Sequence, residues 1–159
     1  MAFDWIEYFT LARLLHENGI MGCSKEATER AAISRAYYSA FCHARNYAYN
    51  KHGFTPTRKA KDHELLISHF EIIEQVDSAF EGVADNLDEL RIWRNNCDYD
   101  DEVAVITDLN SLVEGALEVV LGFLQSVGRI HALKLAERAL RQPAILALNL
   151  AGDGELLRL

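Results

Sequence analysis

A group of polar side chains continues an apolar helical stripe near the middle of the chain. From Leu87 and Leu90, the next position on the same face is Arg94, four residues on. An arginine keeps its charge in proteins, so on a packing face it must be paired or must face a ligand. Asp98 lies one further turn along, where its carboxylate can pair with the guanidinium. Two interpretations stay open: a structural ion pair, or a site where Arg94 binds a phosphate of an RNA backbone.

The residues around Arg94 supply the other groups that phosphate chemistry needs. Asn95, Asp98 and Tyr99 put donors and acceptors within two turns of the guanidinium. In the phosphate interpretation, Arg94 holds the anion and a nearby polar group assists the chemistry. Arg91, at the margin of the same face, is a predicted binding residue.

Charge is distributed unevenly along the 159 residues, whose formal net charge is −8. Residues 1–61 hold nine basic and five acidic side chains, a net of +4. Residues 62–126 hold sixteen acidic and two basic side chains, a net of −14, and the two basic residues are Arg91 and Arg94. The overall charge argues against broad, non-specific nucleic-acid binding, and no DNA partner is expected. It leaves room for one narrow anion site.

No metal site or cofactor is predicted. His63 and His69 are six residues apart, whereas two histidines that share one metal on a helix lie four apart. The three cysteines form an odd set without paired spacing, and no charged-then-apolar leader opens the chain. The longest apolar stretch, residues 112–127, is short and carries two glutamates. We therefore expect a reduced, cytoplasmic protein with no membrane partner.

Helical periodicity runs along the chain, and no segment alternates as a strand would. The sequence predicts an all-α fold: an antiparallel up-and-down bundle of four main helices over residues 1–127, followed by a short amphipathic helical appendage over residues 128–159. The segment 25–50 has apolar residues on two faces and should be the central helix, with Ser24 as its N-cap.

Further helices are expected to begin near Asp62 and around Asp85. The segment 51–61 carries Gly53, Pro56 and four basic residues, and predicts a solvated loop. A last, heptad-like stripe predicts a long packing helix. The stripe consists of Ile106, Leu109, Val113, Ala116, Val120, Leu124 and Val127.

Two segments resemble the HEPN family, in particular its small, single-domain prokaryotic members, several of which are toxins. The first segment is AAISRAYYSAFCHARNYAY, residues 31–49, and the second is LDELRIWRNNCDYDD, residues 87–101. The family's central helix reads approximately Ser-Arg-Ala-Tyr-Tyr-x-Ala-Phe, and a later helix ends in Arg-x-x-x-Asp-Tyr. His63 matches a histidine that often opens the helix between them. The resemblance covers residues 3 to 126.

This resemblance implies a helical bundle that forms a homodimer. Many HEPN proteins are metal-independent ribonucleases, and several are toxins paired with a nucleotidyltransferase-like antitoxin. Their motif has an arginine, a polar residue and a histidine four to six residues after the arginine. Arg94 matches the arginine and Asn95 the polar residue. The resemblance therefore implies that, if the protein cleaves RNA, Arg94 binds the scissile phosphate and stabilises the developing charge, and Asn95 orients it. Asp98 or Tyr99 fills the remaining polar roles, and these four residues are the predicted catalytic set. The resemblance also makes Arg35, Tyr38 and His63 predicted binding residues.

The histidine of the family motif has no counterpart in this sequence. The fifth residue after Arg94 is Tyr99, and the next two are aspartates. Imidazole can move a proton near neutral pH, whereas the phenol of tyrosine is a poor general base. Two functions follow as hypotheses. One is a toxin-like, RNA-associated component of a toxin–antitoxin or defence system, with endoribonuclease activity from a degenerate motif. The other is a non-catalytic interaction module that binds a nucleotide or a partner protein such as a nucleotidyltransferase.

Overall fold

The computed structural model describes residues 3–103 and 109–126, and every regular element in these ranges is helical. The all-α prediction is confirmed. The prediction of four main helices is not, because these ranges contain five α-helices and one 3-10 turn. The predicted appendage, residues 128–159, lies outside the described residues, as do Ile106 and Val127 of the last stripe. The elements are α1 (Ile6–Asn18), α2 (Lys25–Lys51), α3 (Asp62–Glu74), η1 (Ser78–Phe80), α4 (Val83–Tyr99) and α5 (Leu109–Ser126).

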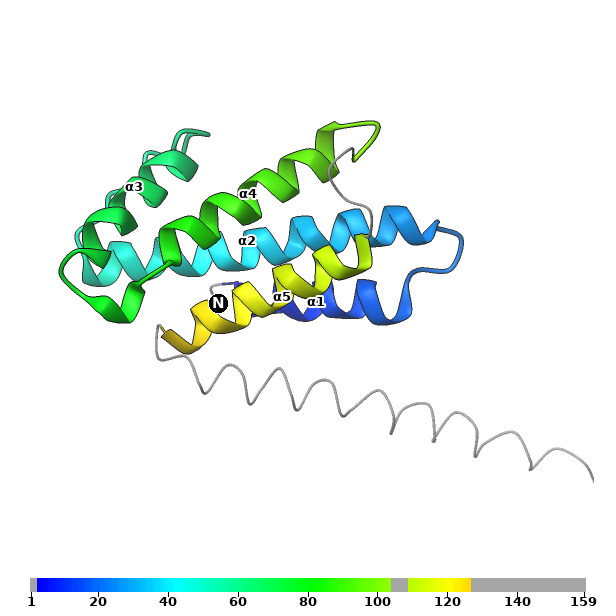
Figure 1. Cartoon of the computed structure of the whole chain (residues 1–159), viewed down its shortest axis with the longest axis horizontal. Coiled ribbons are helices and arrows are strands. Elements are labelled where there is room, and N and C mark those ends of the chain that lie inside the picture. Colours follow the sequence, from blue (N-terminus) through cyan, green and yellow to red (C-terminus); the bar gives the residue numbers. More distant parts are fainter. Residues whose placement is uncertain (1–2, 104–108, 127–159) are drawn as a thin grey trace, which may run out of the picture.

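Helix α2 is the centre of the fold, as its two apolar faces predicted. It begins after Ser24, whose hydroxyl accepts a hydrogen bond from the Ala27 amide at 3.1 Å and so caps the helix. Helices α1, α4 and α5 all pack against it. In Figure 1, α1 and α4 run opposite to α2, whereas α5 runs in the same direction as α2. None of the described helices is both long and apolar enough to cross a membrane.

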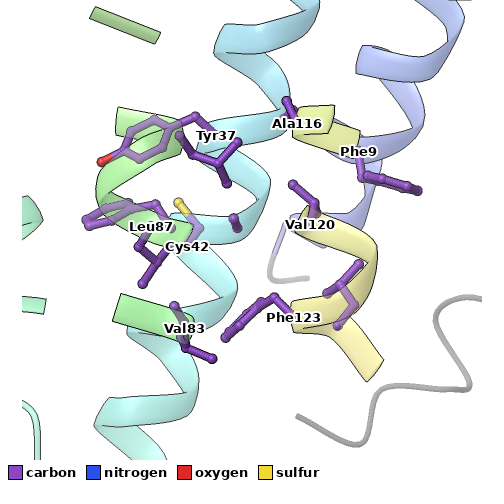
Figure 2. Packing of buried hydrophobic residues seen from close by; sticks show 14 of the residues in the cluster. Phe9, Tyr37, Cys42, Val83, Leu87, Ala116, Val120 and Phe123 are labelled. Carbon is purple, nitrogen blue, oxygen red and sulfur yellow. The ribbon is translucent and has the colours of Figure 1, made fainter. Parts of the chain in front are cut away.

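The core lies where α2, α4 and α5 meet. Val113, Ala116 and Val120 of α5 are fully buried, as the heptad-like stripe predicted, and so is Leu90 of α4. Each buried Val or Leu side chain contributes about 1.5–3 kcal/mol of stability. Figure 2 shows the ring of Tyr37 directed away from the α5 residues Ala116 and Val120. The α2–α5 contact thus fixes the bundle and leaves the other side of α2 for α3 and α4.

Helix α3 packs beside α4 near the carboxyl end of α2 (Figure 1). It begins at Asp62, as predicted, and buries Leu66 and Phe70 completely. Helix α4 begins at Val83, two residues before the predicted start. Gly82 precedes it with a φ of 78°, a left-handed conformation that glycine adopts without a steric penalty. This turn sends α4 back along α2, so that its last turns lie against the first motif segment.

Candidate functional site

Arg94 lies on α4 with a side chain that is only 15% exposed. Its Nε lies 2.8 Å from Oδ2 of Asp98, as an ion pair without hydrogen-bond geometry. Nη1 donates to the side-chain oxygen of Asn95 at 2.8 Å, and Nη2 donates to the Tyr38 hydroxyl at 2.7 Å. The contact between Arg94 and Asp98 confirms what their spacing predicted. The guanidinium is therefore surrounded by groups from its own chain.

Two guanidinium groups lie close to the Tyr38 ring. The Arg94 guanidinium carbon is 5.2 Å from the ring centroid, and that of Arg35 is 5.4 Å from it. Both distances fall in the range of cation–π attraction. Arg35 also lies 4.9 Å from the Tyr8 ring of α1. Tyr38 and Arg35 come from the first motif segment and Arg94 from the second, so the two segments meet at one aromatic ring.

A second set of polar contacts connects the same residues through Ser34. Its hydroxyl donates to Oδ2 of Asp98 at 3.3 Å and accepts a hydrogen bond from Nη2 of Arg35, also at 3.3 Å. Asp98 thus contacts both Arg94 of its own helix and Ser34 of α2. Together with Tyr38, these contacts form a closed network between α2 and α4. Ser34 was not among the predicted site residues, although it opens the first motif.

Tyr99 forms the solvent-facing side of the site. Its side chain is 72% exposed, and its ring centroid lies 5.3 Å from the Arg94 guanidinium carbon. Its hydroxyl lies 3.5 Å from Nη2 of Arg94, which makes this the longest of the four polar contacts of that guanidinium. Tyr99 is also the last residue of α4. It is therefore the partner of Arg94 that an incoming ligand would displace most easily.

His63 approaches the network from the first turn of α3. Its Nδ1 is hydrogen-bonded to the Tyr37 hydroxyl, and its ring centroid lies 4.1 Å from that of Phe41 and 6.4 Å from that of Tyr38. Burial lowers the pKa of His63, and the positive charges of Arg94 and Arg91 lower it further. The imidazole is thus neutral at pH 7 and lies beside the rings of Phe41 and Tyr38.

Arg91 is turned toward α3 instead of the Arg94 network. Its Nη2 lies 2.8 Å from Oε1 of Glu64, and its Nη1 lies 3.8 Å from Oδ1 of Asp88. Both carboxylates form ion pairs with the Arg91 guanidinium, whose side chain is 28% exposed. The structure therefore gathers seven of the eight predicted site residues, Tyr38 included, in one cluster, and gives Arg91 a contact between α4 and α3.

Arg30 was missed by the sequence analysis as a part of this site. Its Nη1 donates to the backbone carbonyls of Cys97 at 3.1 Å and Asp100 at 2.7 Å, and its Nη2 donates to that of Asp101 at 3.2 Å. The last carbonyls of a helix have no partner inside the helix, so these bonds fix the end of α4. A signal was present: Arg30 is one helical turn before Ser34, on the same face of α2.

The described residues contain no group of three His, Cys, Asp or Glu side chains arranged to hold a metal ion. Comparisons of the chain with protein-family models, with curated proteins and with solved structures gave no match.

Proposed function

We propose that this chain is a HEPN-like, RNA-associated protein that acts as a homodimer, as the toxin-like half of a prokaryotic toxin–antitoxin or defence system. One observation carries the proposal. Arg94 of the second motif segment donates to the hydroxyl of Tyr38 of the first, 56 residues away, at 2.7 Å. The two segments behind the resemblance thus build one cationic site with an aromatic ring at its centre.

The chemistry assigned to this site is phosphate binding. An RNA phosphate that replaces the exposed Tyr99 hydroxyl would reach Nη2 of Arg94 and gain a charge-assisted hydrogen bond. Asn95 holds Nη1 and fixes the plane of the guanidinium. If the site also cleaves RNA, Arg94 stabilises the charge that develops on the phosphate. No residue in this scheme requires a metal ion.

A second candidate, the non-catalytic interaction module, is favoured by a different observation. Asp98 lies 2.8 Å from Arg94, and the guanidinium is only 15% exposed. Such an arrangement is typical of a structural ion pair. No histidine follows Arg94 on α4. In this candidate the exposed Tyr99 face binds a partner protein, such as a nucleotidyltransferase-like antitoxin, or a nucleotide, without chemistry.

The deciding experiment measures RNA binding and RNA cleavage in EDTA for the purified protein and its Arg94→Ala variant. Arg13→Ala serves as the control, because Arg13 lies on α1, pairs with Glu17 of the same helix and is not one of the contacts of Arg94 described above. Cleavage that is lost in Arg94→Ala but kept in Arg13→Ala supports the catalytic proposal. Binding without cleavage supports the interaction module. Full activity of Arg94→Ala contradicts the site, and failure to bind RNA contradicts an RNA role.

Three further measurements complete the test. Arg94→Lys keeps the positive charge, so thermal melting of this variant separates loss of function from loss of folding. Tyr99→His places an imidazole where the family motif has one, and is expected to create or increase RNase activity or growth toxicity. Light scattering tests the homodimer, which requires a particle of twice the 18.0 kDa chain mass.

A further inference from the structure

A cleft with a volume of about 740 Å³ lies between the carboxyl half of α2 and the loop that leads to α3. Its size is that of pockets that hold small organic ligands. Basic side chains come from both walls: Arg45 from α2, and Arg58 and Lys59 from the loop. The sequence predicted this loop as a solvated connection, whereas two of its four basic residues line a concave surface. The cleft thus gathers positive charge in a chain whose net charge is −8.

Asp62 is the carboxylate that lines the cleft, and both of its oxygens already accept hydrogen bonds from the loop. Its Oδ1 accepts hydrogen bonds from the amide and the hydroxyl of Thr57, and its Oδ2 accepts one from the Arg58 amide at 2.7 Å. The hydroxyl bond of Thr57 is the largest of the causes that lower the pKa of Asp62. Asp62 therefore holds the loop against the start of α3, and the three basic side chains leave the cleft positively charged.

The loop is also held in an unfavourable backbone conformation. Arg58 has a φ of 60°, and it is the one residue other than glycine with a positive φ among residues 3–103 and 109–126. This left-handed conformation costs a residue with a Cβ roughly 1–2 kcal/mol. Such strain persists where surrounding contacts impose it, as the bonds to Asp62 do here, and it is found most often at ligand sites.

The same cleft presents groups that suit a flat heterocycle. Tyr49 of α2 is 59% exposed, although a ring of this size usually packs against other apolar groups. Asn46, one turn before it, offers an amide donor and an acceptor. Aromatic rings bind bases by stacking, and arginine and lysine bind phosphates. Both requirements of a nucleoside phosphate are met within one cleft.

We infer that this cleft binds a nucleoside phosphate, either as a free nucleotide or as one nucleotide of an RNA strand. The phosphate contacts Arg45, Arg58 and Lys59, and the base stacks on Tyr49. This site is separate from Arg94. The two share His63, which lines the cleft and also contacts Tyr38. The inference does not rest on the proposed function, because none of the Arg94 contacts takes part in it.

The test is calorimetric titration of the full chain with AMP, adenosine, inorganic phosphate and a short single-stranded oligoribonucleotide. AMP is expected to bind more tightly than adenosine or phosphate alone. Arg58→Gly combined with Lys59→Gln should weaken AMP binding by roughly tenfold or more. Arg58→Gly removes the charge and relieves the strained backbone, so this variant keeps its fold. Tyr49→Leu should weaken AMP binding while leaving phosphate binding unchanged.

Lys61→Gln is the matched control, because Lys61 is an exposed cation of the same loop that does not line the cleft. It should change AMP binding by less than about twofold, since the one positive charge that it removes lies outside the site. In the Arg94→Ala protein, where the Arg94 site does not contribute, an oligoribonucleotide that binds more tightly than AMP identifies the strand as the source of the nucleotide, and the reverse order identifies a free nucleotide. The inference is overturned if AMP does not bind, if AMP binds no more tightly than phosphate, or if Lys61→Gln weakens it as much as the double variant. Arg94→Ala should leave AMP binding intact, which separates this test from that of the proposed function.

Discussion

The hydroxyl group of Tyr37 is hydrogen-bonded to Nδ1 of His63 and joins the buried centre of α2 to the first turn of α3. Burial raises the pKa of Tyr37 well above its ordinary value, so the phenol stays protonated. Burial also lowers the pKa of His63, so the imidazole stays neutral. The pair is therefore an uncharged contact beside two arginines, and it connects the Arg94 site to the basic cleft.

Acid should destabilise the protein through His63. Its pKa is lower in the folded chain than in the unfolded chain, so the unfolded state binds more protons between the two values. The free energy of unfolding should fall as the pH decreases below about 6.5, the ordinary value for histidine. Urea unfolding between pH 7.5 and 5.5 measures this slope. His63→Gln should show a smaller loss than the wild type. Equal slopes for the two proteins would exclude His63 as the cause.

The ion pair between Arg94 and Asp98 should contribute measurably to stability. Its two side chains are 15% and 28% exposed, and the Asp98 carboxylate is also bonded to Ser34. A double-mutant cycle with Arg94→Gln and Asp98→Asn should give a coupling energy of about 1–2 kcal/mol. The exposed pair Arg13–Glu17 has the same spacing and should give about 0.3–0.5 kcal/mol. A coupling no larger than this control would show that Asp98 does not stabilise Arg94.

Arg30→Gln should loosen the end of α4. The substitution removes guanidinium bonds to the carbonyls of Cys97, Asp100 and Asp101, and should cost about 1–3 kcal/mol. Hydrogen exchange should speed up in the last turn of α4 more than in α3. Arg30→Lys keeps the positive charge but lacks the planar guanidinium group, and it should recover part of the lost stability. Unchanged exchange at the end of α4 would contradict the assigned role of Arg30.

The three cysteines should differ in reactivity. Burial raises the pKa of the Cys42 and Cys97 thiols to about 11, whereas Cys23 is exposed in the turn before α2. The thiolate is the reactive form, so at pH 8 a maleimide should label Cys23 at least roughly tenfold faster than either buried thiol. Mass spectrometry of the intact chain should show one rapid addition, and Cys23→Ser should abolish it. Rapid labelling of Cys97 would show that the end of α4 opens readily.

Local features of the fold could be predicted from the sequence. The start of α2 at a Ser24 cap, the start of α3 at Asp62 and the buried stripe of α5 follow from spacing within one helix. The Arg94–Asp98 contact does so as well, because residues four apart on a helix are neighbours whatever lies around them. Within the site, the resemblance named Tyr38, which contacts Arg94, and His63, which contacts Tyr38.

Contacts between distant segments could not be predicted in the same way. Arg30 and the end of α4 are about seventy residues apart, and only the packing of α4 on α2 brings them together. The cleft depends on Asp62 folding a basic loop back against α3, and on the strained backbone of Arg58. Hydropathy does not predict this turn, because Thr57, Arg58 and Asp62 are polar residues whether or not they contact one another.

Tyr38 is shared by Arg35 and Arg94, and this arrangement constrains how the sequence can diverge. A change of the ring at this position removes a surface that both guanidiniums contact and a hydroxyl that one of them needs. If either arginine is lost, the Tyr38 ring keeps a cation–π contact with the other arginine alone. In an alignment of relatives, positions 35, 38 and 94 should therefore vary together. That triad of covarying positions offers a way to find diverged relatives whose overall sequence similarity has been lost.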